Sequence, residues 1–332
     1  MVVLKRAHTQ PYRLPSGPPT DGTRHGGWLW LEDEHGRRGL GEYATWPGFA
    51  PPLETLQEWA ERACTLAVDR ELSSLERLVP PELSDAPSPV RYAWESAALD
   101  LVGQAAERPI ADLLRPDAEA SVAINALVSG TDDAVRAVAE GFTTLKIKLK
   151  TLDDLTRVRA VRQAVPASTR IRLDPGGRLT LDEAHALLLA LRELDIEYVE
   201  DPIAATDAEA WLALSKHGVA LAVDQKASAV EWTHTLLATG AADTLVLKPM
   251  FDGGLLATST RAEQWQARGG RVVLTSALES PVGVAAAVHL ACALRLPSAC
   301  GLTTPVRVEG PTLHGGRLAH ARAPGLGARP TP

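Results

Sequence analysis

The chain has 332 residues, of which 45% are hydrophobic and 23% charged, as is typical of a globular protein with a large core. At about 150 residues per domain, this length predicts two domains. The formal net charge is −7, and no run of Lys or Arg is long enough to follow a phosphate backbone. Nucleic acid is therefore not expected as a partner.

The cysteines and the N-terminal sequence predict a cytoplasmic protein without membrane insertion. Cys64, Cys292 and Cys300 are an odd, sparse set without metal-ligand spacing, as expected of idle or buried thiols in a reducing compartment. The N-terminal sequence contains no apolar stretch of the length of a signal peptide, and no run of 18 apolar residues occurs.

The first 120 residues have the pattern of an α+β unit. Short alternating segments broken by Gly and Pro predict strands, and residues 33–38 (DEHGRR) predict a hairpin turn. Residues 53–69 and 89–105 carry apolar side chains at three- and four-residue spacing, which predicts two helices. Strands and helices that follow one another in separate blocks are typical of α+β units.

From residue 121 onward, β-rich runs alternate with helical stretches such as 180–193 and 281–294. The predicted strands are 121–128, 143–149, 170–174, 196–200, 219–223, 243–248, 271–275 and 297–301. Eight such units predict a parallel (β/α) barrel. A doubly wound open sheet is the alternative, which is weakened because no G-x-G-x-x-G motif follows the first strand.

The C-terminal segment is predicted to leave the barrel. Residues 305–318 are expected to return to the N-terminal unit. Residues 319–332 are rich in Pro, Gly and Ala, which predicts a frayed tail.

Polar residues end the predicted strands at regular intervals. They are Lys146, Lys148, Asp174, Glu200, Asp224, Lys248, Ser276 and Gly301. From Lys148 onward the intervals are 26, 26, 24, 24, 28 and 25 residues, about one βα unit each. Because catalytic groups of a barrel lie at the C-terminal ends of its strands, one face of the barrel receives one such group from each strand.

Lys146 and Lys148 are two residues apart on one strand, so both side chains point to the same face. Their neighbours Leu145 and Ile147 are apolar and point to the other face, which in a barrel is covered by helices. The lysines are therefore expected in the barrel interior. An edge strand with a solvated lysine face is the alternative, and the helix pattern that follows the strand argues against it.

Asp174, Glu200 and Asp224 each close an apolar strand. Three carboxylates that converge on one mouth repel each other unless a cation lies among them. Oxygen ligands of this kind suit a hard cation, Mg²⁺ before Ca²⁺ or Mn²⁺. Asp174 alone is also compatible with a helix N-cap, but three carboxylates at this spacing favour a metal site.

A metal flanked by lysines suits removal of a proton α to a carboxylate, because the metal stabilises the enediolate charge. A lysine beside another lysine and a dication is expected to have a lowered pKa, so that it can be neutral and act as the base. With one lysine neutral, three carboxylates (−3), Mg²⁺ (+2) and two ammonium groups (+2) sum to +1, which favours a dianionic substrate.

The sequence resembles the enolase superfamily in a set of short motifs. They are T-L-K-I-K-L (144–149), R-L-D (172–174), Y-V-E-D-P (198–202), A-V-D-Q-K (222–226), L-K-P (247–249) and T-S-A-L-E-S-P-V-G (275–283). The motifs are similar to those of the muconate-lactonizing branch and, within it, of the o-succinylbenzoate synthase family. The resemblance runs over nearly the whole chain, including the P-x-x-R-Y-A-W-E-S-A-A-L-D-L run at 87–101.

The resemblance implies a (β/α)7β TIM-like barrel with an α+β capping domain. The implied boundaries are 1–118 for the capping domain, 119–304 for the barrel, and 305–332 for a C-terminal return to the capping domain. Trp28, Trp30 and the glycine-rich segment 39–48 are then expected in or beside the substrate-specificity loops of the capping domain.

For a member of the synthase family, the implied reaction is the dehydration of 2-succinyl-6-hydroxy-2,4-cyclohexadiene-1-carboxylate to 2-succinylbenzoate in menaquinone biosynthesis. Lys148 is then the base, Lys146 supports it, and Lys248 stabilises the intermediate from the opposite ring face, partly by cation–π attraction. The implied metal ligands are Asp174, Glu200 and Asp224, which hold Mg²⁺, with Mn²⁺ as a substitute.

Three further residues are candidates for substrate binding. Ser276 and the backbone near Gly301 are placed to bind the succinyl carboxylate. Arg172 points to the same face as Asp174 and either orients the site or forms a structural ion pair.

Three departures from the family pattern bear on the substrate. Asp174-Pro175-Gly176 lacks the asparagine of the common Asp-Ala-Asn, and Asp224-Gln225 replaces an Asp-Glu pair. The eighth strand ends in Gly-Leu-Thr-Thr (301–304) rather than in the Asp-x-Asp of dipeptide epimerases, which favours the synthase. N-succinylamino acid racemisation and dipeptide epimerisation remain the alternatives. A non-enzymatic binding barrel would require an accidental spacing of Lys148, Asp174, Glu200, Asp224 and Lys248.

Overall fold

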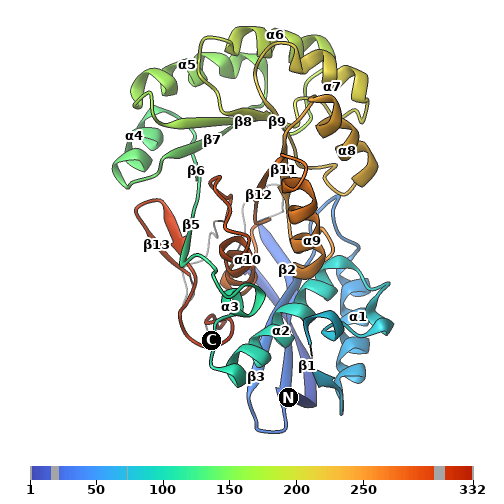
Figure 1. Ribbon diagram of the computed structural model, residues 1–332. Coiled ribbons are helices and arrows are strands. Elements are labelled where there is room, and N and C mark those ends of the chain that lie inside the picture. The colour runs from blue at the N-terminus through green and yellow to red at the C-terminus, as the bar shows by residue number, and fades with distance from the viewer. Residues whose placement is uncertain (1, 16–21, 73, 303–310, 331–332) are drawn as a thin grey trace.

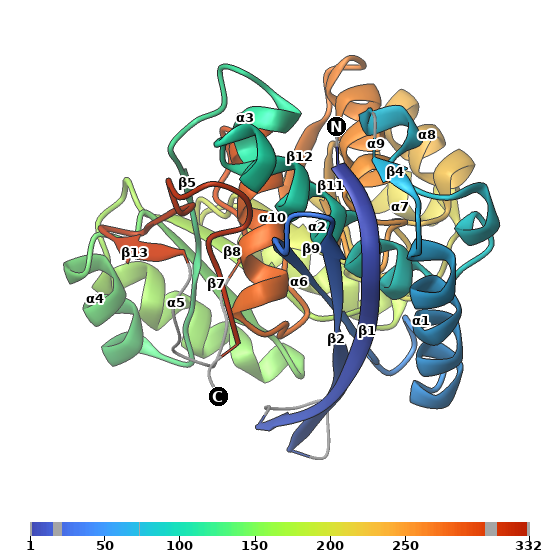
Figure 2. The same cartoon turned by 90° about the horizontal axis from the view of Figure 1, so that it is seen from below.

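The computed structural model describes residues 2–15, 22–72, 74–302 and 311–330. Its N-terminal part contains a four-stranded antiparallel sheet with the order β3(Arg38–Ala44), β2(Thr23–Asp33), β1(Val2–Pro15), β4(Glu71–Leu72). The long β1 and β2 strands run beside each other, as Figure 2 shows. The predicted hairpin turn at 33–38 is confirmed, and Asp33 closes it by accepting the backbone N–H groups of His35 and Arg37 at 2.9 Å each.

Helices cover one face of this sheet. They are α1(Leu53–Ala67) and α2(Ser88–Ala106), with 3-10 turns at Leu75–Arg77 and Pro81–Leu83. The short α3(Ile110–Leu114) packs against α2 and against the later helix α10(Pro281–Ala293). The two helices predicted at 53–69 and 89–105 are thus confirmed. α2 packs very close to β3, where a Cβ atom at Gly41 would lie 1.8 Å from the carbonyl oxygen of Ala93. Glycine at this position therefore allows the helix to rest directly on the strand.

The second part of the chain is a curled sheet of seven parallel strands surrounded by helices (Figure 1). The strands are β6(Ala126–Leu127), β7(Thr144–Lys148), β8(Arg170–Asp174), β9(Tyr198–Glu200), β10(Leu221–Val223), β11(Thr244–Leu247) and β12(Arg271–Leu274). The helices between and after them are α4(Thr131–Ala139), α5(Leu155–Ala164), α6(Leu181–Leu191), α7(Ala208–Ser215), α8(Val230–Thr239), α9(Leu255–Gln266) and α10(Pro281–Ala293), with a 3-10 turn at Leu152–Asp154 before α5. This is the predicted α/β TIM-like barrel.

The predicted eighth strand, 297–301, is reduced to two parallel bridges that close the barrel. Cys300 bridges Ile124, and Gly301 bridges Thr275 at the end of β12. Hydrogen bonds on both sides join the edges of the sheet, from Asn125 N to Cys300 O at 2.9 Å and from Gly301 N to Leu274 O at 2.8 Å.

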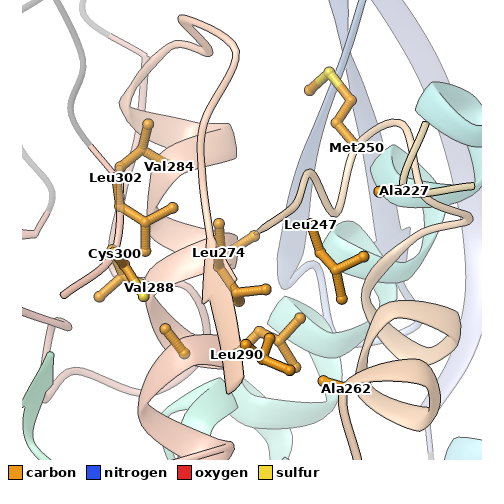
Figure 3. Close-up of a cluster of buried hydrophobic side chains, with 14 of the residues drawn as sticks. Ala227, Leu247, Met250, Ala262, Leu274, Val284, Val288, Leu290, Cys300 and Leu302 are labelled. Carbon is orange, nitrogen blue, oxygen red and sulfur yellow. The ribbon is translucent and has the colours of Figure 1, made fainter. Parts of the chain in front are cut away.

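The core beside this closure is aliphatic. Leu274, Val284, Val288, Cys300 and Leu302 pack between the last strand and α10 (Figure 3). All thirteen residues of α10 are buried, which explains why this helix carries almost no polar side chain.

The C-terminal segment differs from the prediction in two ways. Its hairpin, β13(Thr312–His314) and β14(Arg317–Ala319), pairs with β5(Ser121–Ala123) at the start of the barrel rather than with the N-terminal sheet. The return to the N-terminal part is made further on, where Leu326 N donates to Asp100 Oδ1 of α2 at 2.8 Å.

The prediction of a frayed tail was wrong for the described residues up to 330, because Leu326 and Ala328 are buried. A composition rich in Pro, Gly and Ala does not reveal that a buried carboxylate elsewhere in the chain accepts hydrogen bonds from this segment. Over the described ranges, no helix combines the length and apolarity needed to cross a bilayer.

Candidate active site

The three predicted carboxylates lie side by side at one end of the barrel. Asp174 ends β8, Glu200 ends β9, and Asp224 directly follows β10, and these strands are neighbours in the sheet. Their side chains are 9%, 2% and 15% exposed, respectively. The C-terminal ends of neighbouring parallel strands lie at the same end of a barrel, so the three carboxylates form one buried cluster.

Lys146 and Lys148 flank the cluster from β7. Lys146 Nζ donates to Glu200 Oε1 at 2.8 Å and lies 2.9 Å from Asp174 Oδ2. Lys148 Nζ is 3.9 Å from the same Asp174 oxygen, and its side chain is 63% exposed. The structure thus brings both lysines to the barrel mouth, one buried among the carboxylates and one accessible to a bound molecule.

Lys248 lies on the other side of the cluster. It directly follows β11 and donates a hydrogen bond to Asp224 Oδ1, while its Nζ is 4.8 Å from the centre of the Phe49 ring. Because β8, β9 and β10 lie between β7 and β11, Lys148 and Lys248 face each other across the carboxylates.

The pKa values within the cluster shift in opposite directions. Burial raises the pKa of Asp174, but the charges of Lys146 and Lys148 outweigh it and lower that pKa below its ordinary value. Burial raises the pKa of Glu200 to about 8, with Lys146 opposing and the charges of Asp174 and Asp224 adding to the rise. Burial lowers the pKa of Lys146, but the charges of Asp174 and Glu200 outweigh it and hold that pKa well above its ordinary value.

A similar balance raises the pKa of Lys248, where the charge of Asp224 and its hydrogen bond outweigh burial. The two lysines that are bonded to the carboxylates thus both have raised pKa values.

The donor set fits a hard dication. Besides burial, the charges of Asp174 and Asp224 raise the pKa of Glu200, so the carboxylates repel one another and a cation among them would relieve this repulsion. Among the described residues, no three metal-ligating side chains already converge as a ready metal site. Lys146 and Lys248 are instead bonded to the carboxylate oxygens.

Asp201 is a functional candidate that the sequence reasoning missed. It follows Glu200 in the left-handed region at φ 44°, and its side chain accepts the backbone N–H of Asp224 at 3.0 Å and of Gln225 at 2.7 Å. Burial, together with the charge of Asp224, raises the pKa of Asp201 to about 7. The only sequence signal was its place in the Y-V-E-D-P motif, which does not reveal that the side chain crosses to the next loop.

The first two departures from the family pattern touch each other. The Gln225 side-chain amide donates to the carbonyl oxygen of Gly176 at 2.9 Å, and Gly176 adopts a positive φ of 62°. Gln225 thereby ties the loop after β10 to the loop after β8, where Gly176 offers only backbone. The third departure extends to Thr303 and Thr304, which lie outside the described residues.

The three predicted substrate-binding residues lie in two separate places in the barrel. Ser276 Oγ donates to Gly301 O at 3.2 Å, so these two meet where β12 and the barrel closure end. Arg172 is fully buried and pairs with Glu197 Oε2 at 2.6 Å, while it donates to the carbonyl of Ala299 at 2.6 Å. Of the two alternatives for Arg172, the structure contains the ion pair, which lies inside the barrel beneath the carboxylate cluster.

The apolar side chains that lie at the mouth of the barrel were not predicted from the sequence. Leu127 pairs in register with Lys146 across β6 and β7, so its side chain also points into the barrel, and it is 61% exposed. On the opposite side, Phe49 and Phe251 contact each other with ring centres 5.8 Å apart.

A cavity of about 170 Å³ opens beside Lys248. It is lined by Gly48, Phe49, Asp224, Gln225, Lys226, Ser228, Lys248, Phe251 and Asp252. Gly48 and Phe49 of the N-terminal part therefore contribute directly to the mouth of the barrel.

The comparisons with known proteins agree with this architecture. Residues 131–332 match the family model described as enolase C-terminal domain-like. Over 193 residues the chain is 38% identical to an o-succinylbenzoate synthase of Thermobifida fusca (strain YX), which is 55% of this chain and 60% of that protein. Over 308 residues it is 27% identical to a hydrophobic dipeptide epimerase of Enterococcus faecalis, 88% of this chain and 86% of that one.

Among solved structures, the fold is similar to the dipeptide epimerase from Enterococcus faecalis V583 complexed with Mg and the dipeptide L-Leu-L-Tyr. That comparison gives a TM-score of 0.80 at 24% identity and covers 98% of this chain and 99% of that chain. The barrel, its helices and its N-terminal part thus have a common arrangement in both proteins. On the family match, the chain belongs to the enolase superfamily, in the group with an enolase C-terminal domain-like barrel.

Proposed function

We propose that the chain is an o-succinylbenzoate synthase, a lyase that dehydrates 2-succinyl-6-hydroxy-2,4-cyclohexadiene-1-carboxylate to 2-succinylbenzoate. The observation that carries the proposal is the pair of lysines on opposite sides of three carboxylates, with Lys148 accessible and Lys248 bonded to Asp224. The 38% identity to the Thermobifida fusca synthase supports the choice of substrate.

In this proposal Lys148 Nζ removes the proton α to the ring carboxylate. The electron pair of the broken C–H bond moves toward the carboxylate to give an enediolate, and it then forms a C=C bond within the ring as the C–O bond breaks and hydroxide leaves. The ammonium of Lys148 returns the proton to the departing hydroxide, so that water leaves and the ring becomes aromatic. The side chain of Lys148 suits this role because it is 63% exposed at the mouth and can reach a bound molecule.

Asp174, Glu200 and Asp224 would hold Mg²⁺ in this proposal, as the mutual repulsion of these carboxylates favours. Mg²⁺ supplies positive charge that stabilises an enediolate. Lys146 keeps Asp174 and Glu200 in place through its two contacts, and Lys248 adds an ammonium charge on the opposite face of the ring. Mn²⁺ is proposed as a substitute because it takes the same oxygen ligands.

The rest of the chain is assigned a supporting role. We propose a capping domain at 1–118 and a barrel at 119–304, with the cap supplying apolar side chains such as Phe49 to the mouth. Leu127 and Phe49 suit a substrate with a hydrocarbon ring. A dicarboxylate substrate suits Ser276 and the backbone near Gly301, at the far side of the mouth from the metal.

A second candidate is racemisation of N-succinylamino acids or epimerisation of dipeptides. Lysines on both sides of the α-carbon are what a two-base racemase requires, and the 27% identity to the Enterococcus epimerase extends over 88% of this chain. Against the epimerase stands Gly301-Leu302, where an Asp-x-Asp sequence would begin.

The test uses purified protein with Mg²⁺ and three substrates: the cyclohexadiene, N-succinyl-L-phenylalanine and L-Ala-L-Glu. We expect conversion of the cyclohexadiene to succinylbenzoate and loss of that activity with a chelator. Turnover of an amino acid substrate alone would replace the proposal with the racemase or epimerase.

A further inference from the structure

Helix α2 of the N-terminal part binds the loop that carries Lys248. This loop, residues 248–254, connects β11 to α9. Ser88 Oγ donates to Met250 O at 2.8 Å and accepts the Gly253 N–H at 2.6 Å. Glu95, seven residues further along α2 and so on the same helical face, accepts the Leu256 N–H at 3.1 Å in the first turn of α9.

The loop is compact between these two anchors. Lys248 N donates to Asp252 Oδ2 at 2.5 Å, and Gly254 N donates to Pro249 O at 3.0 Å. Gly254 has a φ of 98°, and a Cβ atom there would lie 2.6 Å from Glu95 Oε2, so glycine is needed for this approach. Movement of either anchor is therefore transmitted to the backbone of Lys248 through only a few bonded residues.

Glu95 is an unusual anchor because it is a carboxylate only 3% exposed. Burial raises its pKa to about 7, while the backbone N–H groups of Leu256 and Leu255 lower it. The positive end of α9 stabilises the ionised form.

We propose that Ser88 and Glu95 are positioning residues that hold the Lys248 ammonium opposite Lys148. This inference rests on the proposed function only for the chemical role of Lys248; the anchoring itself is a property of the fold. It follows that a helix of the N-terminal part governs chemistry on one face of the substrate, whereas Lys148 on β7 pairs with Asp174 on the neighbouring barrel strand β8.

The first test measures the lysines without any substrate. The intact protein is labelled with a trace of acetic anhydride between pH 6 and 10, and the extent of acetylation at Lys146, Lys148 and Lys248 is read by mass spectrometry. In Ser88→Ala and Glu95→Ala we expect Lys248 to be labelled severalfold faster than in the wild type, with Lys148 unchanged. Glu95→Gln keeps an acceptor oxygen, and we expect it to restore most of the protection.

Glu58→Gln is the matched control, since Glu58 is an exposed glutamate on the neighbouring helix α1. It should leave all three labelling rates unchanged. If Glu95→Ala fails to fold, Ser88→Ala still decides whether the anchor on α2 protects Lys248. Unchanged labelling of Lys248 in every folded variant would overturn the inference.

The second test is kinetic and separates the inference from the proposed function. In Ser88→Ala we expect kcat to fall about tenfold with KM nearly unchanged, because the proposed role of Lys248 is to stabilise the intermediate rather than the bound substrate. A parallel rise of KM at constant kcat would contradict a positioning role. If the wild type acts on neither the cyclohexadiene nor N-succinylamino acids, the proposed function fails, while the labelling result still decides the anchoring.

Discussion

At the scale of single residues, the accessible Lys148 is the group whose removal should be most specific. Lys148→Ala should reduce kcat by at least about 10³-fold, because general base catalysis contributes factors of this size. The side chain is 63% exposed, so the thermal midpoint should change little. Lys150→Ala, an exposed lysine two residues further on, is the control and should retain full activity. Activity close to wild type in Lys148→Ala would show that another group is the base.

Leu127 should contribute binding rather than chemistry. Leu127→Asn removes apolar surface from the mouth, and the loss of about 1–2 kcal/mol of burial should raise KM roughly tenfold with kcat nearly constant. Leu189→Asn, an exposed leucine on the outer helix α6, is the matched control. Steady-state kinetics of both variants provide the measurement, and equal KM values would mean that Leu127 does not contact the substrate.

At the scale of elements, the link between successive βα loops depends on Asp201. Asp201→Ala removes the acceptor for the backbone N–H groups of Asp224 and Gln225. Partners that orient metal ligands typically account for 10- to 100-fold in metal affinity, so Mg²⁺ affinity should fall by about that factor. Isothermal titration with MgCl₂ measures it, with Asp182→Ala, an exposed aspartate on the outer helix α6, as the control. Unchanged affinity would contradict this role for Asp201.

The contact between α2 and α9 should make stability depend on pH. The pKa of Glu95 is about 7 in the folded protein against 4.5 for the free group, so between these values the folded state holds a proton that the unfolded chain has released. The resulting stabilisation is complete below pH 4.5 and is lost as pH rises through 7, on the order of 3 kcal/mol in total.

Glu95→Gln lacks this group, so its free energy of unfolding relative to the wild type should increase from pH 5 to pH 8. Urea unfolding at both pH values measures the difference, with Glu58→Gln as the control. A constant difference between wild type and Glu95→Gln would refute the assignment.

At the scale of the whole molecule, a bound dication should stabilise the fold. With Mg²⁺ at 100 times its dissociation constant, linkage predicts about 2.7 kcal/mol of additional stability. The thermal midpoint should therefore rise with MgCl₂ and fall back with a chelator, and NaCl of equal ionic strength is the control. In the double variant Asp174→Asn/Asp224→Asn the shift should disappear.

The barrel and the charged residues at the ends of its strands could be predicted because both recur periodically in the sequence. Lys148, Asp174 and Glu200 recur at the length of one βα unit, and strand alternation places Lys146 beside Lys148. Contacts across large sequence distances leave no such pattern. Glu95 and Leu256 are 161 residues apart.

The buried tail was mispredicted for a related reason. Its Pro, Gly and Ala residues have no periodicity, and their burial depends on Asp100, 226 residues before Leu326. Local composition therefore indicated disorder where a distant acceptor imposes order.

Asp100 also has a consequence for the order in which the chain can fold. Its carboxylate is buried on α2 and accepts the Leu40 N–H at 3.0 Å, the Leu326 N–H at 2.8 Å and the guanidinium of Arg329 at 3.0 Å. On the ribosome, the N-terminal part emerges long before Leu326 and Arg329 are synthesised. Until then, burying Asp100 would leave a carboxylate without its cation, so the N-terminal part has to wait for the completed barrel before it reaches its final stability.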